Sequence, residues 1–298
     1  MHGIRFIPVA LAVLWGFNWP AVKTALSEVQ PFGLRMVGLG VGAVLLALVA
    51  AMIGRSLKVP RSSWIPLVIA GIFNIAGFNL ATVFAQLNTS TSRAAILTFT
   101  TPLWAILMAY LFLGERLDRS KTIALAIGLI GIAVLAAPLI GGQSTLLGLV
   151  FPLVAAFSWA AGTVYQKARP IEGDRMVITA YQLLIAAAMA GIGFGLSGET
   201  LPVTLSPVVW TALTFHVIGA TAIAYLLWFT LLDRLSVGAA SLTTFAIPVV
   251  GVLSAMALVG DRPSPLDFVG FAAILAAAAV AMFAAAPRRV PASVTAEA

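Results

Sequence analysis

The side chains of this chain that could do chemistry are mostly polar residues set inside long apolar runs. A polar group in such a run is costly unless it faces protein or water, so each one is a candidate for contact with a small molecule. For any single residue, a hydrogen bond between two helices is the commoner explanation. The polar candidates are Asn18, Asn74, Asn79, Thr98, His216 and Thr244.

Aromatic residues form the second group of candidates, because they give a bound small molecule apolar contact area. The alternative for each of them is packing, or a place in the lipid belt. The aromatic candidates are Trp15, Phe78, Trp159, Tyr165 and Tyr225.

Two prolines, Pro102 and Pro248, interrupt apolar runs. A proline inside a helix cannot donate to the carbonyl four residues earlier, which belongs here to Thr98 and Thr244. The freed carbonyls could open polar backbone toward a central cavity. Alternatively, threonine hydroxyls or water could satisfy them again. Pro20 frees the carbonyl of Gly16 in the same way.

Acidic side chains are missing from the apolar runs. All ten Asp and Glu fall in loops, at the ends of runs or in the C-terminal tail. A pair of buried aspartates for proteolysis is therefore not expected, and no glycine-rich phosphate loop followed by Lys and Ser or Thr is present. With no cysteine either, the sequence predicts no enzyme, no metal site and no cofactor.

The elements that must position these residues are transmembrane helices. The chain has 298 residues, 61% hydrophobic and 9% charged, whereas soluble domains average roughly 25% charged residues. The apolar runs are continuous and about 20 residues long, enough for one helix to cross a bilayer. We predict an all-α polytopic membrane protein with ten spans. They cover residues 6–23, 34–53, 64–87, 93–113, 120–138, 145–166, 176–196, 207–232, 237–259 and 265–285.

The basic residues predict how the spans are oriented. With both termini in the cytoplasm, 13 of the 17 Lys and Arg lie inside, as the positive-inside rule requires. This bias explains the net charge of +7, so no nucleic-acid partner is expected. Four basic residues are then predicted to lie outside: Lys23, Arg35, Arg93 and Arg262.

The chain also contains an internal duplication. Spans four and nine match at a shift of 146 residues, and spans one and six match at a shift of 144. Because the repeated unit holds five spans, an odd number, the second copy is inverted in the membrane. We predict repeats at 1–143 and 144–287 and a cytoplasmic tail at 288–298. The matched pairs are Trp15/Trp159, Lys23/Lys167, Thr98/Thr244, Pro102/Pro248, Gly114/Gly260 and Arg116/Arg262, with Glu115 facing Asp261.

Lys23 and Lys167 close spans one and six at equivalent positions on opposite sides of the membrane. They could attract a carboxylate at each mouth of a pathway. They could also extend toward the lipid headgroups, which is the favoured interpretation.

The proline-bearing span that ends in Gly114-Glu115-Arg116, its echo at Pro248 to Arg262, and Trp15-Gly16-Phe17-Asn18 in the first span resemble the drug/metabolite transporter superfamily. The EamA-type branch is the most similar, and within it the chain is similar to the YddG-type amino-acid exporters. The resemblance implies a secondary carrier of the bacterial inner membrane that works by alternating access around a midplane cavity. Its expected cargo is small amphipathic metabolites, above all aromatic or apolar amino acids.

Two alternatives remain at this point. The carrier could export drugs or other metabolites, or the chain could be a membrane receptor or scaffold that transports nothing. Two inverted halves with matched kinks favour transport. The expected partners are a small-molecule substrate and the lipid bilayer, and the pattern is compatible with a monomer. Since His216 is the one titratable group expected within the membrane, we expect uniport or weak proton coupling through His216.

Overall fold

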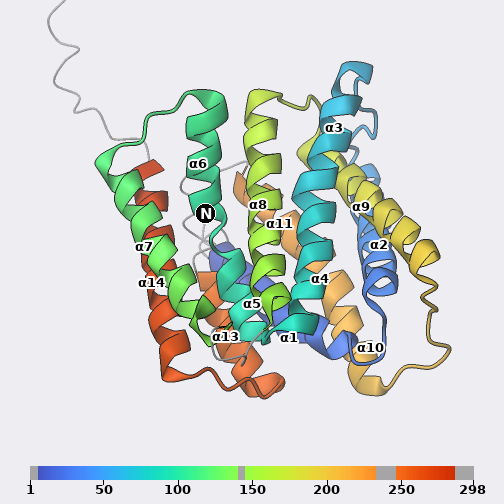
Figure 1. The fold of residues 1–298 in the computed structure, drawn as a ribbon. Coiled ribbons are helices and arrows are strands. Elements are labelled where there is room, and N and C mark those ends of the chain that lie inside the picture. Colours follow the sequence, from blue (N-terminus) through green and yellow to red (C-terminus); the bar gives the residue numbers. More distant parts are fainter. Residues whose placement is uncertain (1–5, 140–144, 233–245, 286–298) are drawn as a thin grey trace, which may run out of the picture.

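The computed structural model describes residues 6–139, 145–232 and 246–285. Within these ranges the secondary structure is helical throughout. The helices run side by side between two ends of a bundle (Figure 1). We call the end where α5 begins the lower end and the end where α6 finishes the upper end, as they lie in Figure 1.

The first half of the chain forms five spans, two of which consist of several helical segments. Spans one and two are α1 (Ile7–Ala25) and α2 (Pro31–Met52). After the short 3₁₀ turn η2 (Arg61–Ser63), span three runs through α3 (Trp64–Ala70), η3 (Gly71–Gly77) and α4 (Phe78–Asn88). Spans four and five are α5 (Thr91–Thr98) with α6 (Thr101–Leu113), and α7 (Arg119–Ala136) with the 3₁₀ turn η4 (Ala137–Leu139).

The second half repeats this order. Spans six and seven are α8 (Leu146–Ala168) and α9 (Arg175–Ser197), and span eight joins α10 (Pro207–Thr214), η5 (Phe215–Ile223) and α11 (Ala224–Leu232). Of span nine the structure describes α13 (Ala246–Leu258), so the predicted start of this span at 237 lies outside the described residues. Span ten is α14 (Pro265–Ala285).

Length and composition agree with this assignment. Seven of the described helical segments are long and apolar enough to cross a bilayer, and two further apolar helices, Ala246–Leu258 and Pro265–Ala281, are shorter. Each predicted span has its helical counterpart, so the predicted all-α polytopic fold is confirmed.

The two halves end their fourth and ninth spans in the same way. Gly114 after α6 has φ 67° and Gly260 after α13 has φ 72°, a left-handed conformation that glycine adopts at little cost. In each case the N–H of the following acidic residue donates to a carbonyl six residues back, Ala109 (3.2 Å) or Ala255 (3.3 Å). The left-handed glycine turns the chain so that an N–H just beyond the helix meets a carbonyl near the end of that helix, which explains why the sequence repeats glycine at these two helix ends.

A second shared feature is a π-helical segment inside spans three and eight, η3 and η5. At a shift of 142 residues Phe73 aligns with Phe215, and Gly77 aligns with Gly219. The two π segments therefore overlap at equivalent positions. In a π-helix each N–H reaches the carbonyl five residues back, and such segments are frequent at functional sites.

Pro102 breaks span four instead of kinking it. Helix α5 ends at Thr98, and α6 begins at Thr101 with Pro102 in its first turn, a position where a missing N–H costs little. The hydroxyl of Thr101 donates to the freed carbonyl of Thr98 at 2.8 Å. Of the two alternatives for this proline, the structure therefore has the one in which threonine satisfies the carbonyl.

The helices pack in pairs around the bundle. Helix α2 packs along α9 and α7 along α14, while α1 contacts α13, and α8 contacts α4 and α6. In Figure 1 the α7–α14 pair lies at one side of the bundle. Only 22% of the apolar window of span five is buried. Span five therefore presents most of this apolar surface outward from the bundle.

We expect Gly148→Ala to destabilise the protein by about 1–3 kcal/mol, the usual cost of overpacking. A methyl group at Gly148 would lie 2.5 Å from the carbonyl oxygen of Asn88, which is backbone and cannot rotate away. The control is Gly195→Ala in α9, where a methyl group meets no atom within 4 Å. Thermal unfolding in detergent should show a lower midpoint for Gly148→Ala and an unchanged or higher one for Gly195→Ala; equal midpoints would contradict the expectation.

Candidate functional site

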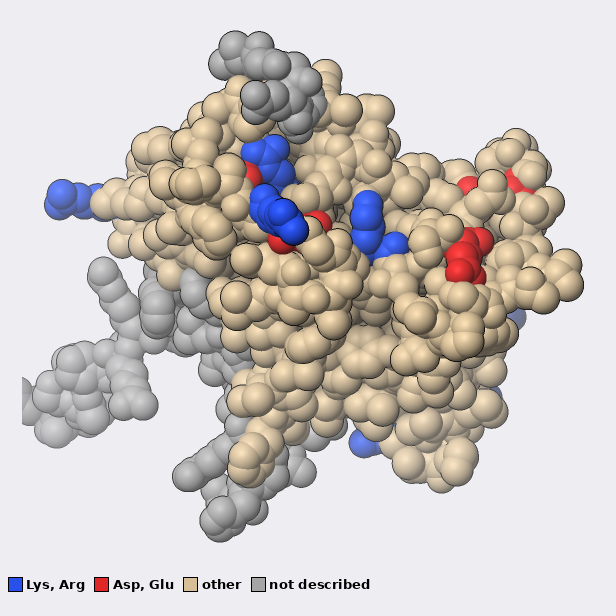
Figure 2. Space-filling view, turned by 90° about the horizontal axis from the view of Figure 1, so that it is seen from below, with Lys and Arg blue, Asp and Glu red and all other residues tan. Residues whose placement is uncertain are grey.

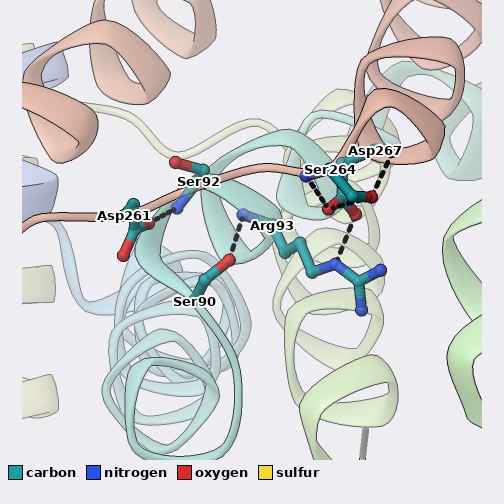
Figure 3. Close-up of polar contacts among 6 residues, drawn as sticks. All are labelled: Ser90, Ser92, Arg93, Asp261, Ser264 and Asp267. Carbon is teal, nitrogen blue, oxygen red and sulfur yellow. Dashed lines mark hydrogen bonds and ion pairs between the residues drawn. The ribbon is translucent and has the colours of Figure 1, made fainter. Parts of the chain in front are cut away.

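At the lower end, carboxylates of the second half hold the start of α5 (Figure 3). Asp261 accepts a hydrogen bond from the backbone N–H of Ser92 at 2.7 Å. Asp267, at the start of α14, pairs with the Arg93 side chain at 2.6 Å and also accepts from the N–H and the hydroxyl of Ser264. The span that carries Pro102 is thus fixed at one end to spans nine and ten.

At the same end, hydrogen bonds join the α1–α2 loop and the start of α2 to the loop between α9 and α10. Glu199 accepts from the backbone N–H groups of Phe32 and Gly33 in the first turn of α2. Glu28 accepts from the backbone N–H of Ser206 at 2.8 Å, and hydrogen bonding from Ser206 lowers the pKa of the Glu28 carboxyl. Figure 2 shows that charged side chains gather in a few small groups on this otherwise uncharged face.

At the upper end, Glu115 lies between two lysines. Its carboxylate is 2.5 Å from the Lys167 ammonium and 3.3 Å from that of Lys121. The hydrogen bond from Lys167 is the main cause of a lowered pKa of Glu115. The symmetry mate of Lys167, Lys23, instead donates to the backbone carbonyl of Gln86. Both predicted mouth lysines thus contact protein groups in this conformation, and their role at a mouth stays a prediction.

We expect Glu115→Gln to remove an acid-sensitive contribution to stability. A carboxylate with a lowered folded-state pKa stabilises the fold above its unfolded pKa, near 4.5, and this contribution disappears as the pH falls through the lower folded-state value. The pair is partly exposed, so the effect is small, at most about 1 kcal/mol. Unfolding midpoints of wild type and Glu115→Gln, measured from pH 7 to pH 3, should converge at acid pH; a constant difference would contradict this assignment.

A cluster of polar side chains crosses the interior between α1, α2, α4 and η5. At its centre is Arg35, whose side chain is 2% exposed. Its Nε donates to the carbonyl of Asn79 at 3.0 Å and its Nη2 to the hydroxyl of Thr82 at 3.2 Å. Its Nη1 lies 3.4 Å from Nε2 of His216, which is also 2% exposed. We call Asn18, Arg35, Asn79, Thr82 and His216 the Arg35 cluster.

The hydrogen bonds determine the tautomer of His216. Arginine has only donors, so Nε2 of His216 must accept from Arg35 and the ring proton must be on Nδ1. Nδ1 then donates to Oδ1 of Asn18, 2.7 Å away. His216 is the tenth residue of span eight, which places it about 14 Å from the start of the span at 1.5 Å per residue. The hydrogen-bonded chain from Arg35 to Asn18 therefore passes through a neutral imidazole well inside span eight.

The aromatic candidates lie in two groups. The indole Nε1 of Trp15 donates to the carbonyl of Ala220 in η5 at 3.0 Å, and the Trp15 ring lies 5.8 Å from that of Tyr225. Trp159, the symmetry mate of Trp15, packs edge-on against Phe78 at 5.0 Å. Trp15 is one turn from Asn18 on α1, so the first group adjoins the Arg35 cluster. Tyr165 is half-buried on α8.

The remaining candidates are separate from this cluster. The hydroxyl of Thr98 donates to the carbonyl of Ala95 within its own helix at 2.8 Å. Pro248 is buried in α13, and Thr244 lies outside the described residues. In span one, the carbonyl of Gly16 that Pro20 frees accepts from the hydroxyl of Ser254 at 3.3 Å.

The pair of Asn18 and His216, which joins span one to span eight, has no full counterpart between the equivalent spans six and three. Asn74 aligns with His216 at the shift of 142 that superposes the π segments, and Gly162 aligns with Asn18 at the shift of 144. A methyl group at Gly162 would lie 1.7 Å from Oδ1 of Asn74. That buried oxygen has no hydrogen-bond partner among the described residues. Equivalent helices therefore meet at both places, span one with span eight and span six with span three, but only the first contact is a polar pair.

The structure corrects two predictions about charge. Arg35 was expected among the basic residues outside the membrane, but its guanidinium is buried between spans two, three and eight. His216 is consequently not the one titratable group in the interior. The available signal was an arginine at the fifth position of an otherwise apolar helix.

Helices that cross the bilayer in two inverted sets of five, with an interior polar cluster, define a multi-pass membrane carrier rather than an enzyme. The model of the EamA-like transporter family matches residues 3–137 and again residues 146–283. The chain belongs to this family. The double match confirms the duplication, while the boundaries at 143/144 and 287/288 stay predictions.

Individual relatives resemble the chain over most of its length. It is 29% identical to "Uncharacterized transporter YvbV" of Bacillus subtilis over 82% of this chain and 80% of the relative. It is 26% identical to a "Probable amino-acid metabolite efflux pump" of Escherichia coli, over 90% of this chain and 91% of the relative. It is also 26% identical to a "Probable terminal-alkyne amino-acid exporter" of Streptantibioticus cattleyicolor, over 88% of this chain and 87% of the relative.

One solved crystal structure superposes on the chain with a TM-score of 0.65, covering 96% of this chain and 98% of that one at 23% sequence identity. At this identity the likeness supports the fold alone.

Proposed function

We propose that this EamA transporter exports amino acids with aromatic or apolar side chains across the bacterial inner membrane, by alternating access, with both termini in the cytoplasm. The observation that carries the proposal is the Arg35 cluster beside Trp15, because it combines polar groups with aromatic surface in the interior. Relatives named as amino-acid efflux pumps and exporters support the substrate class.

The proposed site uses the two kinds of group that an amphipathic amino acid needs. Amide, hydroxyl and backbone oxygens would hold the ammonium group, and aromatic rings would hold the apolar side chain. The residues proposed to line the pathway are Trp15, Asn18, Asn74, Phe78, Asn79, Thr98, Pro102, Trp159, Tyr165, His216, Tyr225, Thr244 and Pro248.

Counterflow in proteoliposomes tests the substrate class. Vesicles loaded with each amino acid, a common drug or another metabolite are diluted into a labelled form of the same compound. Accumulation driven by aromatic or apolar amino acids is the expected result. If every amino acid fails while a drug or another metabolite drives counterflow, the transporter has another substrate class. If no compound in the panel exchanges, the proposal is wrong.

We expect Trp15→Ala to lower amino-acid counterflow at least about tenfold, with a fold that remains intact. The substitution removes the ring beside Tyr225 and the hydrogen bond to Ala220, a loss of about 1–3 kcal/mol. The matched control is Trp210→Ala, since Trp210 is 58% exposed on α10. Initial counterflow rates at equal protein density compare the variants, and equal losses in both would exclude a specific role for Trp15.

A further inference from the structure

We propose that Arg35 binds the carboxylate of the transported amino acid, and this proposal rests on the function proposed above. The predicted site contained groups for the ammonium and the side chain but none for the third part of a zwitterion. The structure places a buried guanidinium beside those groups.

The charge of Arg35 has no counterion among the residues that the structure describes. Its neighbours there are a backbone carbonyl, a hydroxyl, a neutral imidazole and, close enough for a charge interaction, the phenol of Tyr225. None of the described salt bridges includes it. Glu199 faces the same end of α2, but its carboxylate accepts from the backbone N–H groups of Phe32 and Gly33. Arginine stays protonated in proteins, so the interior of the bundle holds a cation that none of the described carboxylates neutralises.

A purely structural role does not account for that charge. A neutral amide could also donate to the carbonyl of Asn79 and the hydroxyl of Thr82, without the desolvation cost of a buried cation. Arg35 is the fifth residue of α2, near the helix end whose dipole favours anions and disfavours cations. A bound anion would relieve both the desolvation cost and the unfavourable helix dipole, because the ion pair is neutral overall and the anion faces the positive end of the helix.

The geometry leaves donors for a carboxylate. A guanidinium has five N–H groups, and three of them serve the contacts with Asn79, Thr82 and His216. The contact with His216 is 3.4 Å long, near the limit for a hydrogen bond, so it is the easiest to replace. A carboxylate that displaced it would accept two parallel N–H groups, the strong bidentate arrangement.

The same displacement would prepare a place for the ammonium group. Nε2 of His216 loses its donor when Arg35 turns to the carboxylate, while Nδ1 continues to donate to Asn18. An acceptor then faces the site next to the guanidinium. An α-amino acid carries its ammonium beside its carboxylate, so it can occupy both groups at once, with its side chain toward Trp15. The site thereby selects zwitterions over amines that lack an acid.

The test compares three probes on the purified full-length transporter in proteoliposomes: phenylalanine, phenylalaninamide, which lacks the carboxylate, and 3-phenylpropionate, which lacks the amine. Wild type is expected to bind phenylalanine at least about tenfold more tightly than the amide. The Arg35→Gln variant should lose this preference, because its affinity for phenylalanine falls while its affinity for phenylalaninamide is unchanged. Arg55→Gln, at an exposed pair with Asp174, is the matched control and should retain the preference.

Several outcomes overturn the proposal. Equal wild-type affinities for phenylalanine and its amide would contradict the proposed carboxylate site, but they would not contradict the proposed function. Equal loss of both ligands in a stably folded Arg35→Gln variant would make Arg35 structural. If Arg35→Gln does not fold, Arg35→Lys replaces it, because it keeps the charge but not the bidentate geometry, and it should reduce the preference. If only 3-phenylpropionate binds, and its binding depends on Arg35, then the carboxylate site is supported and the proposed export of amino acids is wrong.

Discussion

Asp267→Ala is expected to lower the free energy of unfolding by about 3–5 kcal/mol, the cost of breaking a buried ion pair on one side. The Arg93–Asp267 contact is 2.6 Å long, with side chains only 14% and 9% exposed. Removing the carboxylate strands the Arg93 guanidinium and frees two hydrogen bonds from Ser264. Denaturant unfolding in detergent micelles measures the change.

Two comparisons make this expectation specific. The double variant Arg93→Met with Asp267→Ala should recover part of the lost stability, because it no longer contains an unpaired buried charge. Asp174→Ala breaks the more exposed ion pair with Arg55, and losing that pair should cost only about 0–1 kcal/mol. Asp174 is also the N-cap of α9, so the cost of losing the cap is added to this value. If the single and double variants at the lower end are equally unstable, the stranded charge is not the cause.

His216→Leu is expected to lower transport at least about tenfold, whereas His216→Gln should keep most of it. Leucine leaves Oδ1 of Asn18 and Nη1 of Arg35 without partners, and each orphaned buried group costs about 1–3 kcal/mol. Glutamine can accept from Arg35 through its oxygen and donate to Asn18 through its nitrogen, so it can continue the chain that His216 forms.

The glutamine variant also addresses proton coupling. In the observed arrangement Nε2 of His216 accepts a hydrogen bond from the Arg35 cation. A second ring proton on Nε2 would point at that N–H donor, so this arrangement disfavours protonation of His216. We therefore expect transport by His216→Gln to respond to an imposed pH gradient as wild type does. Flux in proteoliposomes with and without the gradient measures this. A gradient response that is present in wild type and lost in His216→Gln would show that His216 carries the coupled proton.

The arrangement of spans could be predicted from the sequence because the bilayer imposes it. Continuous apolar runs of one helix length mark the spans, and an odd repeat of five inverts the second half. The match of Gly114 with Gly260 was also visible, but the left-handed conformation that both adopt came from the structure. The break at Pro102 was anticipated as a kink, and its conversion to two helices depends on the local turn at Phe99 and Thr100.

The site was less predictable, because it depends on the direction and reach of side chains. Sequence placed Asn18, Asn79 and His216 among the candidates, and the structure joins them through Arg35. Arg35 itself was assigned to the outside, because the order of the spans and the positive-inside rule place the start of span two there. Its side chain points inward, which no hydropathy window can record. The inward hydrogen bond of Thr98 to Ala95 was equally invisible.

The π segments of spans three and eight have a consequence for the history of the chain. A π turn closes over one residue more than an α-helical turn, so a π segment is what a single-residue insertion into an α-helix produces. Both halves carry such a segment at aligned positions, between Phe73 and Gly77 and between Phe215 and Gly219. One insertion before the duplication explains both. The irregular third helix is therefore part of the repeated five-helix unit and not a feature of one half alone.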